Sequence, residues 1–188
     1  MSNPLLESSS LPQFSKIKPE HVKPAVEHAI KLGRDAIEKA LSENTIYTWQ
    51  NLVMPIDEAD DILAKLWSPV SHMNSVVNSE ALRDAYEECL PLLSEYGTWV
   101  GQHKGLYNAY QQIADSEAFK QLDQAQQKVI SNALRDFQLS GIALNEDDQK
   151  TYGKIVSRLS ELSSKFSNNV LDATQAFSVL ITDESELA

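Results

Sequence analysis

Residues 145–177 read NEDDQKTYGKIVSRLSELSSKFSNNVLDATQAF, and the spacing of the apolar side chains in this stretch sets the fold class of the chain. The apolar residues recur in steps of three or four: Tyr152, Ile155, Leu159, Leu162, Phe166, Val170, Ala173 and Phe177. This spacing predicts one stripe along a helix, close to a coiled-coil seam, with Ser, Asn, Lys and Arg on the opposite face. From residue 145 to residue 174 the helix would be about 45 Å long, so we expect it to be a spine on which other helices pack.

The composition limits the classes of protein to which the chain can belong. Its 188 residues suffice for one domain with a proper core, or for one domain and the beginning of a second. The net charge of -11 argues against a nucleic-acid-binding protein, which needs a basic surface. No apolar run approaches the ~18 residues of a membrane span, and residues 1–10 contain no secretory signal. We therefore expect a cytoplasmic protein with neither nucleic-acid nor membrane partners.

Five further helices are expected before residue 145, with Thr48 and Ser79 as N-caps of two of them and Asn145 as the N-cap of the last helix. Proline inside a helix removes an amide donor, so we expect kinks or restarts at Pro55, Pro69 and Pro91, and residues 68–76 to be the least regular part. The expected fold is all-α, an antiparallel bundle of about six helices, several of them kinked by proline. Residues 1–176 form this helical domain, and residues 1–15 are an extended arm lying over it.

Residues 177–182 (FSVLIT) break the helical pattern, because their apolar residues alternate as in a β-strand. A lone strand would leave its amides and carbonyls unpaired, which a compact domain does not tolerate. We therefore expect residues 177–188 to be the first strand and the start of a missing remainder, so that the chain is the N-terminal piece of a longer protein. Such a strand would be free to pair with a second copy of the chain, which predicts self-association.

No constellation of residues predicts catalysis, cofactor binding or metal binding within this chain. His21 and His28 are two helical turns apart, and neither His72 nor His103 has a ligand at metal-binding spacing nearby. The motifs of zinc peptidases, serine hydrolases and phosphate-binding loops are absent from the sequence. The single cysteine, Cys89, cannot form an internal disulfide, and we expect a packed thiol. The expected catalytic, cofactor-binding and metal-binding residues are therefore none.

Several longer strings carry a resemblance to a known family. They are residues 68–76 (SPVSHMNSV), 90–96 (LPLLSEY), 99–103 (WVGQH), 132–137 (NALRDF), 139–141 (LSG), 158–162 (RLSEL) and 166–174 (FSNNVLDAT), together with 3–6 (NPLL), 14–17 (FSKI) and 19–22 (PEHV). With these strings the chain resembles, over essentially its whole length, the N-terminal region of bacterial members of the thimet oligopeptidase family of zinc metallopeptidases.

The resemblance implies a full-length cytoplasmic enzyme that hydrolyses short peptides in a deep channel between two mostly helical halves. In that family zinc is bound by a His-Glu-x-x-His helix and a later glutamate in the C-terminal half, and none of these positions exists here. The implied partners are thus the C-terminal catalytic half of the same protein and short peptides, and this piece, inactive alone, would be a wall of the channel. The alternative is a stand-alone helical module that binds a partner through an exposed groove.

Overall fold

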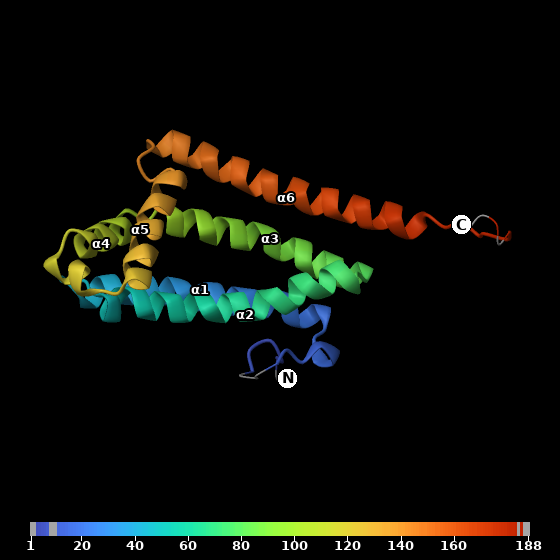
Figure 1. Cartoon of the computed structure of the whole chain (residues 1–188), viewed down its shortest axis with the longest axis horizontal. Helices are drawn as coiled ribbons and strands as arrows, with labels where there is room; N and C mark the ends of the chain where they lie inside the picture. Colours follow the sequence, from blue (N-terminus) through green and yellow to red (C-terminus); the bar gives the residue numbers. More distant parts are fainter. Residues whose placement is uncertain (1–2, 8–10, 184, 186–188) are drawn as a thin grey trace.

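The computed structural model describes residues 3–7, 11–183 and 185, and most of them belong to helices (Figure 1). The six α-helices among these residues are α1 (Pro19–Glu43), α2 (Met54–Val76), α3 (Glu80–Gly101), α4 (Lys104–Ala114), α5 (Gln124–Leu139) and α6 (Glu146–Ala176). Short 3-10 turns cover Phe14–Lys16 and Glu117–Gln121, and a π-helical turn, Trp49–Val53, leads into α2. The prediction of an all-α bundle of about six helices is confirmed.

The helix starts follow from local hydrogen bonds that the sequence encodes. The Thr48 hydroxyl accepts a bond from the Asn51 amide at 3.2 Å, and the Ser79 hydroxyl accepts one from the Leu82 amide at 3.4 Å. The Asn145 side chain accepts bonds from the amides of Asp147 and Asp148 at 3.1 and 2.9 Å. Each bond satisfies an amide that the first helical turn leaves unpaired. All three predicted N-caps are therefore confirmed.

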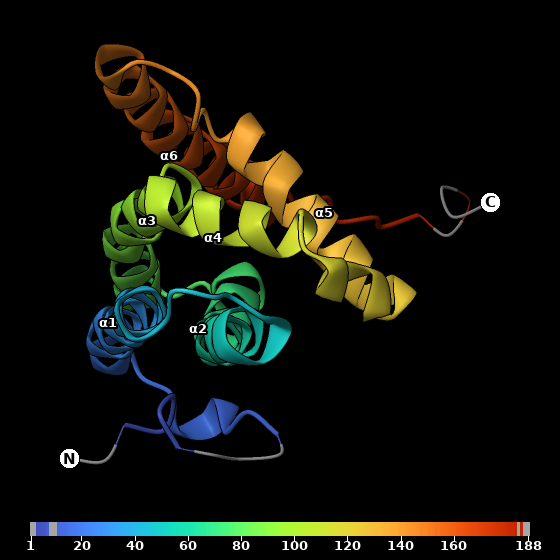
Figure 2. The ribbon, with the colours of Figure 1, turned by 90° about the vertical axis from the view of Figure 1, so that its left-hand side faces the viewer.

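The long helices α1, α2 and α3 lie side by side, and α4 and α5 close one end of the molecule (Figures 1 and 2). One apolar cluster joins α1, α2 and α3, with Val22, Val26, Leu66, Val70 and Cys89 fully or almost fully buried. A second joins the other end of α1 to α4 and α5 through Ile37, Leu52, Leu106, Ile130 and Phe137. The burial of Cys89 confirms the expected packed thiol.

The described part of the N-terminal arm, residues 3–7 and 11–15, lies on the helices. Asn3 Nδ2 donates to the carbonyl of His21 at 2.8 Å, and Leu5 packs against the cluster of α1, α2 and α3. The Phe14 ring contacts the ring of His72 with centroids 5.8 Å apart. Residues 1–2 and 8–10 of the expected arm lie outside the described residues.

The expected irregularity of residues 68–76 is wrong, because α2 continues to Val76. Pro24, Pro69 and Pro91 all lie inside α-helices. A proline costs one backbone hydrogen bond, and the burial of Pro69 and Val70 against neighbouring helices offsets that loss. The ribbon of α2 changes direction over its last turns, which follow Pro69 in the sequence (Figure 1).

The expected β-strand at residues 177–182 is also not formed. Phe177 has extended backbone angles, but residues 177–183 have no regular secondary structure. A strand needs a neighbour to pair its amides and carbonyls, and no strand occurs among the residues that the structure describes. Residues 184 and 186–188 of the expected strand region lie outside the described part.

The expectation that the last helix is a spine on which several other helices pack is wrong as well, because α6 packs mainly on α3. Helix α6 lies at the edge of the bundle and packs along α3, as both ribbon views show (Figures 1 and 2). Asn168 is its one buried residue within the described part. The apolar stripe that suggested a spine therefore faces away from the core. In the described ranges, no helix is both long enough and apolar enough to cross a bilayer.

Candidate functional site

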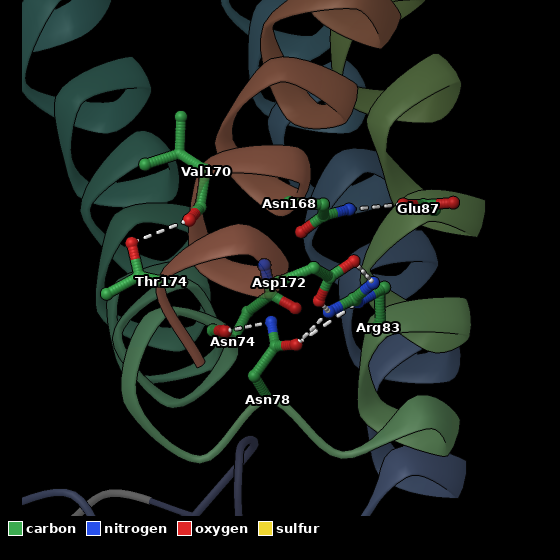
Figure 3. Close-up of polar contacts among 8 residues, drawn as sticks. All are labelled: Asn74, Asn78, Arg83, Glu87, Asn168, Val170, Asp172 and Thr174. Carbon is green, nitrogen blue, oxygen red and sulfur yellow. Dashed lines mark hydrogen bonds and ion pairs between the residues drawn. The ribbon is translucent and has the colours of Figure 1, made fainter. Parts of the chain in front are cut away.

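The most unusual surface of this chain is the contact between α3 and α6, which is polar where helix contacts are normally apolar. Asn168 Nδ2 donates to Glu87 Oε1 at 2.7 Å across this contact (Figure 3). Gly153, nearer the start of α6, packs on Thr98, so closely that a Cβ at Gly153 would stand 3.4 Å from Thr98 Cγ2. Small and polar residues thus take part in the contact of α6 with α3, and the partly buried apolar residues of α6 are Tyr152, Val156 and Leu171.

Arg83 and Asp172 join the far ends of the two helices. Arg83 Nη2 and Nη1 donate to the two carboxylate oxygens of Asp172 at 2.7 and 3.0 Å, in a two-point ion pair (Figure 3). These hydrogen bonds hold the pKa of Asp172 below its usual value and the pKa of Arg83 above its own.

Asn78, in the turn between α2 and α3, orients Arg83. Its side-chain oxygen accepts from Arg83 Nε at 3.1 Å and from Arg83 Nη2, while its Nδ2 donates to the carbonyl of Asn74 at 2.6 Å (Figure 3). Asn78 has a φ of 43°, and it is the one non-glycine residue with positive φ among those described. Asparagine tolerates this left-handed conformation better than most residues. The turn therefore fixes the guanidinium that holds α6.

A cleft of about 570 Å³ lies between α3 and α6 beside this network. Its lining is polar and of mixed charge: Arg83, Glu87, Ser157, Glu161, Ser164, Lys165, Asn168, Asn169 and Asp172, with Leu90 and Pro91. The Ser164 hydroxyl is buried without a hydrogen-bond partner in the described part of the chain. The cleft offers donors and acceptors, but no lining residue is a histidine or cysteine. It can bind polar groups, and it has no nucleophile paired with a base.

The four histidines lie at separate places in the structure and do not form one cluster. His21 Nδ1 accepts from the Lys18 amide at 3.1 Å, and His103 Nδ1 accepts from the Leu106 amide at 3.0 Å, so both cap helices. His72 contacts Phe14, and His28 is exposed and lines a pocket together with residues of the N-terminal arm. No group of three or more His, Cys, Asp or Glu residues that could hold a metal occurs among the described residues. The zinc that the family resemblance implies therefore finds no fitting ligand set in that part of this chain.

The other charged pairs singled out in the sequence are exposed at the surface, and several of the aromatic residues are packed in the core. Arg158–Glu161 and Arg135–Asp136 are ion pairs with both side chains more than half exposed. Among the aromatic residues, Tyr96 and Tyr110 are buried, and Trp67 stacks on Tyr86 with centroids 4.7 Å apart. Burial of the Tyr110 phenol raises its pKa to about 12. These groups stabilise the fold and offer no reactive centre.

The network at Arg83 has no signature in the sequence. Arg83 and Asp172 are 89 positions apart, and Glu87 and Asn168 are 81 apart, so no local spacing joins them. In the sequence, the string that contains Asn168 and Asp172 carries part of the family resemblance and forms a polar helical face, but nothing in it indicates which helix that face contacts. The structure shows that both of these residues pack on α3.

On the outer side of α6 the apolar stripe is exposed. The exposed fractions are 54% for Ile155, 57% for Leu159, 43% for Leu162, 71% for Phe166 and 50% for Val170. Helix α6 thus turns its polar face to its own domain and its apolar face outward. Soluble proteins seldom expose a continuous apolar row of this length unless something covers it.

Comparison with known proteins identifies relatives over the whole chain. The family model for the N-terminal domain of neurolysin and thimet oligopeptidase matches residues 27–150. The chain is 57% identical to oligopeptidase A of Salmonella typhimurium and 58% identical to oligopeptidase A of Haemophilus influenzae, over 100% of its length in each case. It is 35% identical, over 99% of its length, to a probable cytosolic oligopeptidase A of Arabidopsis thaliana. The chain spans only 28% of the length of the two bacterial relatives and 26% of the plant one.

Proposed function

Because this chain belongs to the neurolysin and thimet oligopeptidase family and contains that family's N-terminal domain, we propose that it is the N-terminal helical part of a zinc-dependent oligopeptidase. The complete protein hydrolyses peptide bonds in short peptides. The observation that carries this proposal is an identity of 55–58% to proteins named oligopeptidase A in three bacteria, over the whole chain.

Within that enzyme this chain has a structural role and forms part of the wall of the substrate channel. The chemistry of its side chains supports the structural role. His21 and His103 cap helices, and the polar groups Arg83, Glu87, Asn168 and Asp172 between α3 and α6 bind one another. The isolated chain is therefore inactive, with no catalytic, cofactor-binding or metal-binding residue of its own.

We place the zinc of the complete enzyme outside this chain, and in support of this no group of three or more His, Cys, Asp or Glu residues that could hold a metal occurs among the described residues. When bound, zinc polarises the scissile carbonyl and lowers the pKa of a bound water. The C-terminal catalytic half of the same polypeptide holds the metal and is the main partner of this chain.

The division of the chain follows from the helices. Residues 1–176 form the helical domain, and residues 177–188 begin the next part of the protein. The exposed apolar side chains of Phe177, Val179 and Leu180 support this division, because they find no place in the helical core. The cytoplasm is the proposed compartment, in keeping with the name of the probable cytosolic relative in Arabidopsis thaliana.

A stand-alone helical interaction module is the second candidate, and the exposed stripe on α6 is the observation in its favour. The two candidates differ in the polypeptide that they require beyond residue 188. A module needs no further chain, whereas an oligopeptidase continues into a His-Glu-x-x-His helix. The sequence beyond residue 188 therefore discriminates between them.

The proposal is tested by expressing the complete encoded polypeptide and the 188-residue chain side by side. Hydrolysis of a short quenched-fluorescence peptide and bound zinc are measured for both. We expect chelator-sensitive hydrolysis and about one zinc per molecule for the complete polypeptide alone. Zinc-dependent hydrolysis by the 188-residue chain would overturn the structural role, and a complete polypeptide without hydrolysis would overturn the proposed enzyme.

A further inference from the structure

One apolar row on α6, here called the α6 stripe, is exposed and suited to docking. It consists of Ile155, Leu159, Leu162 and Phe166. We propose that the α6 stripe binds an amphipathic helix from the polypeptide beyond residue 188, in a coiled-coil-like contact. This inference rests on the proposed function, because it names the surface through which the N-terminal part meets the rest of the enzyme.

The stripe cannot be buried by turning α6 over, because the opposite face of the helix is bound to α3. At about 3.6 residues per turn, Phe166 and Asn168 differ by about 200° around the helix axis. Asn168 is held by Glu87, and Asp172 is held by Arg83 (Figure 3). At the other end of α6, Gln149 Nε2 donates to the carbonyls of Gly141 and Ile142 at 3.2 and 3.3 Å. Bonds at both ends thus fix the outward direction of the stripe.

The spacing of the stripe suits a helical partner. From residue 155 the steps are four, three and four, which alternate as in the a and d positions of a heptad. In a coiled coil, each side chain of such a row inserts into a hole between four residues of the facing helix, and the row receives the side chains of that helix in the same way. An extended strand would match this spacing poorly, because its side chains repeat every two residues. The occupant is therefore a helix with its own apolar row.

The remainder of the same polypeptide is a better occupant than a second copy of this chain. The relatives at 57 and 58% identity include α6 in the match, and 72% of their length (100 − 28) lies outside it. The apolar surface continues beyond α6 through Phe177 and Leu180, which are 75% and 87% exposed and lead towards that remainder. Two copies would instead bring together two molecules with a net charge of -11 each, which repel one another.

Cysteine labelling tests the proposal, because Cys89, the single native thiol of this chain, is buried. Leu159→Cys and Phe166→Cys are made separately in the complete polypeptide and in the 188-residue chain. Each is treated with a maleimide, and the peptide carrying the new cysteine is followed by mass spectrometry. Lys120→Cys is the matched control, because its side chain is 68% exposed and lies in the 3-10 turn before α5. Hydrogen exchange of the unmodified proteins reports on α6 without any substitution.

We expect both stripe cysteines to react on the order of tenfold or more slowly in the complete polypeptide than in the 188-residue chain, with the control unchanged. Equal rates in the two proteins would overturn the proposal. Protection in the 188-residue chain that rises with its concentration would overturn it in favour of a second copy. A complete polypeptide that protects the stripe but hydrolyses no peptide supports the docking surface and removes only the proposed enzyme activity.

Discussion

Arg83 on α3 and Asp172 on α6 form a two-point ion pair at 2.7 and 3.0 Å, and this pair holds the C-terminal part of α6 on the bundle. The ion pair adds attraction to a contact between α3 and α6 that has less apolar packing than helix contacts usually have. Helices in a soluble domain normally associate through apolar faces, whereas here the apolar face of α6 points outward. Polar bonds between side chains, above all those of Arg83 with Asp172 and of Glu87 with Asn168, therefore contribute to the position of α6.

Removing the ion pair should loosen α6 without unfolding the core. We expect Arg83→Ala and Asp172→Asn to speed amide exchange in the second half of α6, while exchange in α1 and α2 stays unchanged. The effect will be modest, because both partners are accessible to solvent. The double variant should add little to either single variant, since both remove the same contact. Arg135→Ala, which removes an exposed ion pair on α5, is the control.

The same pair predicts how α6 responds to acid. The folded pKa of Asp172 lies below its usual value of 3.8, so the carboxylate binds protons less readily when the helix is docked. Its contribution is fully present above about pH 4, and it is lost as the pH falls through the lowered folded pKa. We expect the NMR titration of the Asp172 carboxyl to move up towards its usual value in Arg83→Ala. An unchanged titration would show that Arg83 does not stabilise the charged form.

Asn78 should tolerate glycine better than alanine. Its φ of 43° is costly for alanine and free for glycine, and its side chain bonds both Asn74 and Arg83. We expect Asn78→Ala to lower the free energy of unfolding by about 1–3 kcal/mol and Asn78→Gly by less. Urea denaturation measures both. Equal losses would mean that the side-chain bonds matter and the backbone conformation does not.

Gly33 should resist even the smallest side chain. A Cβ at this position would stand 2.1 Å from the hydroxyl oxygen of Tyr96, and the Tyr96 ring is itself buried and stacked against Trp99. Gly33→Ala is therefore expected to cost about 1–3 kcal/mol in the free energy of unfolding. Tyr96→Phe removes the nearest atom, so it should restore part of this loss in the double variant. Gly97→Ala, where a Cβ would meet no atom within 4 Å, is the matched control.

Cys89 should be inert while the chain is folded. Its side chain is fully buried, and burial raises the pKa of the thiol to about 11. Because the thiolate is the reactive form, we expect almost no reaction with a thiol reagent at pH 8 until urea unfolds the chain. Rapid reaction of the native protein would contradict the packing of α1 against α3.

The helical class of the chain and three of its helix starts can be predicted from the sequence, because these features depend on contacts between residues at most about four positions apart. Thr48, Ser79 and Asn145 cap helices as their types predict, and the stripe from Ile155 to Phe166 lies on one side of a helix as its spacing predicts. The family resemblance was likewise carried by strings of neighbouring residues.

The contacts of each face of α6 cannot be predicted from the sequence, because they depend on how the helices pack. An apolar row in the sequence shows that a helix has a face to cover, but it does not show which surface covers it. Here Arg83 and Glu87 on α3 bind Asp172 and Asn168 on the polar face of α6. The apolar row of α6 is therefore exposed to solvent. Residues 177–182 also depend on a distant partner. Their alternating apolar residues favour a strand, but only a neighbouring strand can pair the backbone amides and carbonyls of that strand. Both outcomes depend on partners distant in the sequence, which local patterns do not specify.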